Sequence, residues 1–131
     1  MLTIPLSLLA THFVADFLLQ TDWMALNKSK SWKALCTHGL VYSVCFSWLG
    51  VYFFIVTFLT HTFTDMLTSR ITSRLWFVDL RTRGDSSKKL KWPYFAYINP
   101  KKRHWFFVMI GFDQLIHFTT LGLTYKYLFG G

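Results

Sequence analysis

Long apolar stretches alternate with short polar stretches along this chain. From Ala34 to Thr64 no Lys, Arg, Asp or Glu occurs. As a single helix this run would be about 45 Å long, which exceeds the bilayer core of about 30 Å. Gly50 lies near its middle, where a glycine favours a turn. The pattern therefore predicts a hairpin of two helices, at about 34–49 and 51–72.

Two further apolar segments, at about 2–20 and 104–128, flank this hairpin. The polar stretch TDWMALNKSKSWK, residues 21–33, predicts a short interfacial helix with Trp23 and Trp32 at headgroup depth. Residues 74–103 contain Gly84, Pro93, Pro100 and many cations, which indicates a basic loop. The predicted fold class is all-α. We expect one transmembrane domain, residues 1–131, built as a four-helix transmembrane bundle with a short interfacial helix and one basic cytoplasmic loop.

Composition agrees with a membrane location. Hydrophobic residues make up 53% of the chain, and only 15% of the residues are charged, against about 25% in soluble domains. Of the 14 Lys and Arg residues, all except Lys126 lie between Lys28 and Arg103. The positive-inside rule then places both basic loops in the cytoplasm and both termini outside. Basic loops of this kind contact anionic lipid, so we expect no nucleic-acid partner.

Polar residues interrupt the apolar segments at a regular spacing. His12 and Asp16, His61 and Asp65, and Asp113 and His117 are each four residues apart, so each pair lies on one helix face. The second segment contributes His38. Counted from the segment ends, all seven side chains lie at a similar depth. The sequence therefore predicts one polar layer, at or slightly cytoplasmic of the midplane.

Such a layer suits a metal ion. A carboxylate in hydrocarbon is costly unless it faces a partner, and imidazole with carboxylate binds zinc, manganese or iron. We expect one or two divalent ions, preferably zinc, with seven candidate ligands: His12, Asp16, His38, His61, Asp65, Asp113 and His117. His38 is either a ligand or the catalytic base. A hydrogen-bonded network that joins the helices and a proton relay are the alternatives. Interhelical polar contacts average only about 0.6 kcal/mol, so three His/Asp pairs exceed what packing needs.

The leading hypothesis is a metal-dependent hydrolase of a phosphate-ester or lipid-linked substrate, because a bound metal activates water. Donors for an anionic substrate would come from five further residues: Gln20, Asn27, Lys28, Arg70 and Gln114. One alternative is a homo-oligomeric transporter or channel for a metal ion, a proton or a small polar solute. Another is a non-enzymatic phage or bacterial membrane effector.

The polar motifs also carry a family resemblance. HxxxDxxLQ occurs at residues 12–20, NKS at 27–29, HxxxY at 38–42, HxxxD at 61–65 and DxxxH at 113–117. This series resembles a family of small bacterial and phage integral membrane proteins classed as a domain of unknown function. The resemblance implies a multi-pass protein of the bacterial inner membrane. By residue type alone, the chain is also similar to membrane-bound proteins described as metal-dependent hydrolases.

Overall fold

A computed structural model describes residues 4–76 and 103–130. In this part of the chain five α-helices occur and no strand: α1 (Leu6–Phe13), which continues into the π-helical turn η1 (Val14–Leu18), then α2 (Asp22–Asn27), α3 (Trp32–Val44), the 3-10 turn η2 (Ser47–Leu49), α4 (Val51–Trp76) and α5 (Arg103–Phe129). The all-α prediction is confirmed for these residues. Most of the expected basic loop, residues 77–102, lies outside them.

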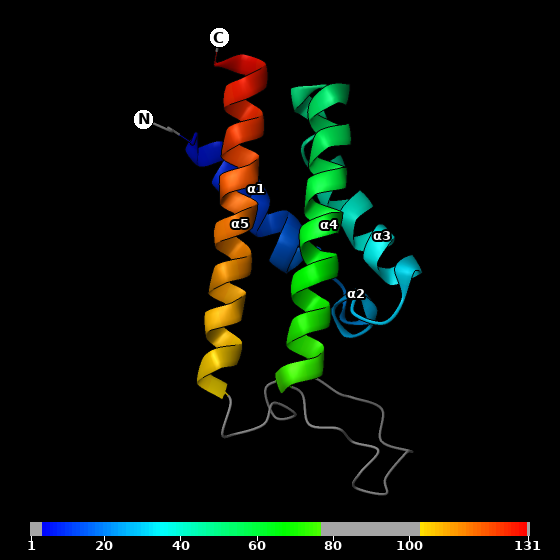
Figure 1. The fold of residues 1–131 in the computed structure, drawn as a ribbon. Helices are drawn as coiled ribbons and strands as arrows, with labels where there is room; N and C mark the ends of the chain where they lie inside the picture. Colours follow the sequence, from blue (N-terminus) through cyan, green and yellow to red (C-terminus); the bar gives the residue numbers. More distant parts are fainter. Residues whose placement is uncertain (1–3, 77–102, 131) are drawn as a thin grey trace, which may run out of the picture.

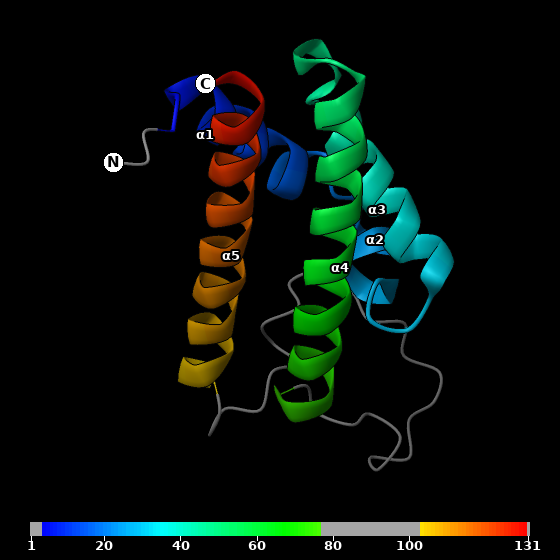
Figure 2. The same cartoon turned by 45° about the horizontal axis from the view of Figure 1, so that its top comes forward.

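The two longest helices, α4 and α5, run antiparallel and side by side (Figure 1). Helix α3 packs against α4, and η1 contacts α3. Figure 2 shows that α1 starts at the end of the bundle where α5 finishes, so both termini lie at that end. Helix α2 lies beside the first half of α3, nearer the opposite end. The four predicted apolar segments therefore pack together around one interior.

Local signals explain where the helices begin. The side chains of Thr21 and Ser31 cap α2 and α3 by accepting hydrogen bonds from the backbone N–H groups of Met24 and Ala34. Gly50 precedes α4 with a φ of 99°, a left-handed conformation that favours glycine. The predicted hairpin therefore turns at Gly50. Helix α3, however, already ends at Val44, because the residues before Gly50 form a turn and η2.

Two of the four predicted spans have the length that a membrane requires. The helical segments Val51–Ser73 and His104–Phe129 are long and apolar enough to cross a bilayer. The segment Leu6–Leu18 and helix α3 each have 13 residues, about 20 Å against a bilayer core of about 30 Å. The spans expected at 2–20 and 34–49 are therefore shorter than predicted, because the helical backbone ends at Leu18 in the first and gives way to a turn and η2 after Val44 in the second.

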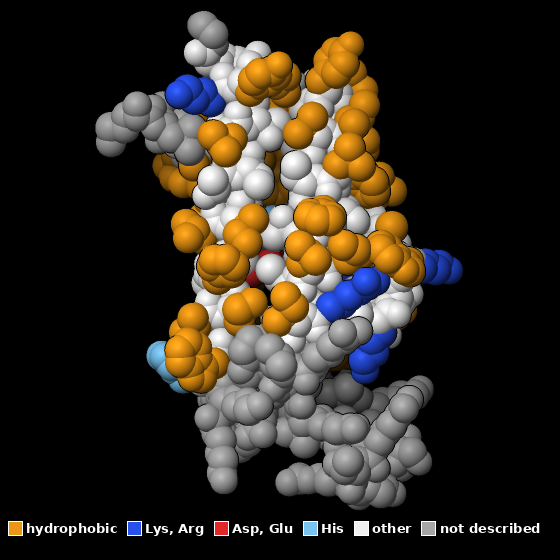
Figure 3. Space-filling view, in the orientation of Figure 1, with side chains coloured by type: hydrophobic (Ala, Val, Ile, Leu, Met, Phe, Trp, Pro, Cys, Tyr) orange, Lys and Arg blue, Asp and Glu red, His pale blue; other side chains and the backbone are white. Residues whose placement is uncertain are grey.

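The interior has an apolar and a polar layer. Leu8, Phe46, Phe53 and Leu121 form the buried apolar layer on the side of the termini. One to two helical turns further into the bundle, the interior becomes polar, with His12, His38, His61 and His117 all buried. The outer faces of α4 and α5, in contrast, carry exposed large apolar side chains (Figure 3). The molecule is thus apolar outside and polar at its centre.

Candidate metal centre

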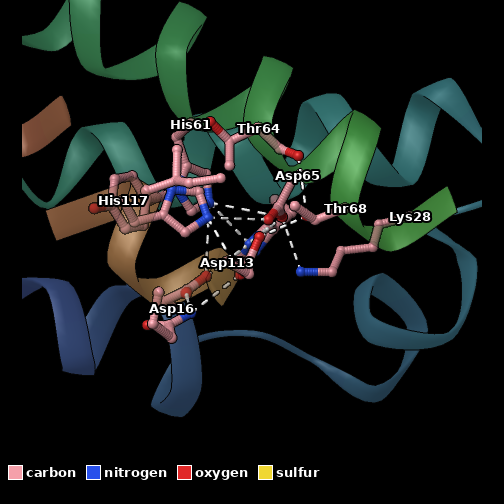
Figure 4. Close-up of polar contacts among 12 residues, drawn as sticks. Asp16, Lys28, His61, Thr64, Asp65, Thr68, Asp113 and His117 are labelled. Carbon is pink, nitrogen blue, oxygen red and sulfur yellow. Dashed lines mark hydrogen bonds and ion pairs between the residues drawn. The ribbon is translucent and has the colours of Figure 1, made fainter. Parts of the chain in front are cut away.

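The predicted polar layer forms in the structure. Short side-chain contacts join all seven candidate ligands in one region between the helices: His12, Asp16, His38, His61, Asp65, Asp113 and His117. Figure 4 labels five of them, Asp16, His61, Asp65, Asp113 and His117, which point toward one another. Six of them are buried, and Asp113 is partly buried. The four-residue spacings place each His/Asp pair on the inner face of its helix, as expected.

Four of these residues form an inner group: Asp16, His38, His61 and Asp65. The Nε2 atom of His38 lies 3.1 Å from an oxygen of Asp16, 3.1 Å from an oxygen of Asp65 and 3.1 Å from Nε2 of His61. His61 Nε2 is 3.6 Å from Asp16 and 3.7 Å from Asp65. One N–H can donate to only one of these neighbours at good geometry, whereas a single cation can be bound by all four atoms. The inner group therefore has the donor set of a metal site.

A second group shares Asp16 with the first and adds Asp113 and His117. His117 Nε2 lies 3.5 Å from Asp113 and 3.3 Å from Oδ1 of Asp65. Asp65 uses its other oxygen, Oδ2, toward His38. The two groups are thus adjacent, with Asp16 in both and Asp65 in contact with both.

Lys28 enters the layer from the end of α2. Its ammonium lies 2.8 Å from Oδ2 of Asp65, and its side chain is only 17% exposed. Burial by itself would lower the pKa of this lysine. The carboxylates of Asp65 and Asp16 outweigh burial and raise the pKa, so the ammonium is charged at neutral pH. The sequence predicted Lys28 as a donor for an anionic substrate, and in the structure its ammonium contacts Asp65 of the layer.

The hydrogen bonds of its two ring nitrogens separate His12 from the inner group. The amide nitrogen of Gln114 donates to Asp16 at 3.0 Å and to Asp113 at 3.2 Å, because a carboxylate can only accept. The amide oxygen of Gln114 therefore faces His12 Nε2, at 2.7 Å, and that nitrogen must carry the proton. His12 Nδ1 then accepts from the hydroxyl of Tyr42, also at 2.7 Å. Both nitrogens of His12 are occupied, and His12 belongs to neither ligand group.

The other predicted substrate residues occupy different positions. Gln114 lies inside the layer, whereas Gln20 has no contact with the layer among the described residues. Asn27 donates to the backbone carbonyl of Trp23 at 2.8 Å. The guanidinium of Arg70 stacks over the ring of Trp32, 4.5 Å from its centroid. Trp32, predicted for the interfacial helix, is the first residue of α3.

Two contacts to the layer were not predicted from the sequence. The ring of Tyr42 stacks on His61, with centroids 3.6 Å apart, and Thr68 donates from its hydroxyl to Asp113 at 2.5 Å. Tyr42 follows His38 by four residues, and Thr68 follows Asp65 by three, so both share a helix face with a predicted ligand. That spacing was the available signal, but Tyr and Thr are also frequent in helix packing.

A small cavity lies against the layer on the side of the apolar core. Its volume is about 10 Å³, and it is lined by His61, His117 and Tyr42 together with three threonines of α4 and α5. A volume of this size holds about one water molecule. The layer can therefore accept a water beside His61 and His117.

The comparison with known proteins identifies the family. A family model described as protein of unknown function (DUF3307) matches residues 4–130, a range that includes all the candidate ligands. No curated protein and no solved structure matches the chain. The predicted resemblance to a family of unknown function is confirmed in this respect. The chain belongs to the family described as protein of unknown function (DUF3307).

Proposed function

We propose that this protein is a multi-pass protein of the bacterial inner membrane that binds a divalent metal in its polar layer. With that metal it hydrolyses a phosphate-ester or lipid-linked substrate. The observation that supports this most directly is the inner group, in which two imidazole nitrogens and two carboxylate oxygens lie within 4.8 Å of one another. The inner group comes from η1, α3 and α4, and α5 adds Asp113 and His117 beside it.

The surface supports the membrane location. Exposed apolar patches of this extent mark contact with lipid or with another protein, and here they cover helices of membrane-spanning length. Helices α4 and α5 would cross the bilayer, while α1–η1 and α3 complete the four-helix bundle as shorter segments. The described end near α2 carries Lys28, Lys30 and Lys33, which supports a cytoplasmic location for that end and for the basic loop.

The ligand roles follow from the geometry. Asp16, His38, His61 and Asp65 would bind the ion, since their atoms converge. Asp113 and His117 would lie beside it, and His12 would support the site through Gln114. Zinc suits a tetrahedral set of two imidazoles and two carboxylates, with manganese or iron as alternatives.

The proposed chemistry is hydrolysis by a metal-activated water. A bound divalent ion lowers the pKa of its water to about 7. The cavity beside His61 and His117 would hold a water next to one of the proposed ligands, His61. If His38 serves as a ligand, His117 is the imidazole that remains to accept the proton, because it borders the cavity and is oriented by Asp65 and Asp113.

A substrate would reach the layer at its exposed edge. The side chain of Asp113 is 15% exposed, and acidic surface is visible between α4 and α5 in Figure 3. Arg70 follows Asp65 on α4 by less than two turns. It lines a surface pocket together with Met66 and Ile71. A guanidinium beside apolar side chains suits an anionic group carried by a lipid or a phosphate ester.

Metal content tests the proposal. The full chain is purified in detergent without chelator or immobilised nickel, and metals are measured by mass spectrometry. We expect about one zinc, manganese or iron per chain, and loss of most of it in His61→Ala. His104→Ala is the matched control, because His104 is exposed at the start of α5. Release of phosphate from ester substrates should decline with the metal.

Two results would contradict the proposal. Less than about a tenth of a metal per chain after loading would exclude a functional metal site. Full metal content in His61→Ala would show that the ion binds elsewhere.

Ion transport is the second candidate. The layer is buried and its adjoining cavity holds little more than one water, which suits a small ion better than an organic substrate. With two helices of membrane-spanning length among the described residues, a transporter or channel would need a homo-oligomer. Zinc uptake into proteoliposomes without any hydrolytic product would favour this function over hydrolysis.

A further inference from the structure

Lys28 is the one described cation that contacts the polar layer. It is the C-cap residue of α2, a helix whose start is fixed by the Thr21 cap. From there its side chain reaches Asp65 at 2.8 Å and stays mostly buried. Figure 4 shows the ammonium approaching the carboxylates from the side opposite His117. A surface lysine of an interfacial helix would instead extend into solvent, so this burial needs an explanation.

The charges of the layer supply one. Asp16, Asp65 and Asp113 bring three negative charges, and Lys28 brings one positive charge. With neutral imidazoles, the form that binds metal, the described layer has a net charge of two negative units. One divalent ion would neutralise it. Two divalent ions beside the ammonium would leave an excess of two positive charges in a buried, apolar surrounding, against an excess of one without the ammonium, and the larger excess is the more unfavourable.

We propose that the layer holds a single divalent ion and that Lys28 takes the place of a second one. The inference rests on the proposed function, because it presupposes metal binding. The ion would lie in the inner group, and the second group would remain without metal. Lys28 binds Oδ2 of Asp65, whose two oxygens face the two groups, Oδ2 toward His38 and Oδ1 toward His117. Its positive charge therefore lies on the carboxylate that joins both groups, where it disfavours a second cation.

This arrangement gives Lys28 a defined role. In a two-ion site the second ion stabilises negative charge that develops on the substrate. An ammonium can do the same as a point charge without being lost to a chelator. Lys28 would thus set the number of ions and supply the second positive charge of the site. Its role is distinct from that of Arg70, which contacts Trp32 and not the layer.

Ion counting tests the inference. Wild-type protein, Lys28→Met and the control Lys30→Met are purified in detergent as full chains, loaded with zinc and desalted. Lys30 is exposed and two residues away, so its variant loses the same charge outside the layer. We expect about one zinc in the wild type and in Lys30→Met. Lys28→Met should bind about two, the first about tenfold more tightly or better.

A charge-balanced variant guards against misfolding. Lys28→Met leaves Asp65 without its ammonium and can destabilise the fold, whereas Lys28→Met combined with Asp113→Asn restores the net charge. The double variant should return to about one zinc, and Asp113→Asn alone, which has the same ligands but keeps the Lys28 charge, should bind that zinc less tightly. If Lys28→Met alone cannot be purified in a monodisperse form, the difference in zinc affinity between Asp113→Asn and the double variant tests the role of Lys28, and equal affinities would overturn it.

The outcomes separate this inference from the proposed function. Two zinc ions in the wild type, or an unchanged count and affinity in Lys28→Met, would overturn the role of Lys28 and leave metal binding intact. No zinc in the wild type would overturn both.

Discussion

At the scale of single residues, the orientation of the Gln114 side-chain amide determines the directions of the hydrogen bonds around it in the layer. Gln114 must turn its nitrogen toward Asp16 and Asp113, and this determines which nitrogen of His12 carries a proton. Tyr42 completes the chain through His12 Nδ1. A chain of hydrogen bonds therefore runs from Tyr42 through His12 and Gln114 and holds the two carboxylates in place. The layer has an inner group of convergent atoms and an outer set of supporting hydrogen bonds.

Tyr42→Phe tests this chain of hydrogen bonds. The variant keeps the ring that stacks on His61 but removes the hydroxyl that bonds to His12. A buried acceptor without its donor costs about 1–3 kcal/mol. We expect a lower unfolding midpoint in detergent and an unchanged metal count. Tyr52→Phe is the control, since Tyr52 is 75% exposed. A loss of metal as large as that of His61→Ala would place Tyr42 in the site itself.

At the scale of the elements, two local features bring the ligands together. The π-helical turn η1, closed by the bond from Leu19 N–H to the Val14 carbonyl at 2.9 Å, contains Asp16. Such turns are frequent at functional sites. Between α3 and α4, Gly39 lies directly against Thr62, and a Cβ at Gly39 would overlap the threonine hydroxyl. The missing side chain lets α3 approach α4 closely enough for His38 to reach His61.

Gly39→Ala should therefore separate α3 from α4. Overpacking at such a contact costs about 1–3 kcal/mol, and we expect a lower unfolding midpoint together with weaker zinc binding. Gly111→Ala on α5 is the matched control, because a Cβ there meets no atom within 4 Å. Its stability should be unchanged or slightly higher, as alanine favours helix. Full zinc affinity in a destabilised Gly39→Ala protein would show that the approach of α3 does not set the site.

At the scale of the whole molecule, polarity is reversed relative to a soluble domain. The outer faces of α4 and α5 are apolar, and the interior holds four histidines and three aspartates. In lipid such an interior is stable only if its members bind one another or an ion. The membrane proposal and the metal proposal thus support each other.

The orientation in the membrane follows from this proposal. After replacement of the native Cys36 and Cys45, single cysteines are placed at the exposed positions Lys30 and Ser47, which flank the two ends of α3. We expect a membrane-impermeant reagent to label Ser47→Cys from the periplasm and Lys30→Cys only after the membrane is opened. Labelling of both positions from one side of the intact membrane would exclude the proposed crossing.

The sequence by itself determined the helical segments, the turn at Gly50 and the membership of the polar layer. These features are local. Four-residue spacing fixes which side chains share a helix face, and depth along each segment fixes which faces carry polar groups at the same level. All seven predicted ligands met for that reason.

Only the tertiary structure decided which atoms face one another. Lys28 lies 37 residues from Asp65, and His12 lies 102 residues from Gln114. Spacing within one helix says nothing of the rotation and tilt of another, so neither contact could be predicted. The lengths of α1–η1 and α3 also departed from the apolar pattern, because apolar residues continue past the helix ends into the turns that follow. The sequence specified the donors, and the packing of α3, α4, α5 and η1 decided that Lys28 joins them while His12 supports them from outside.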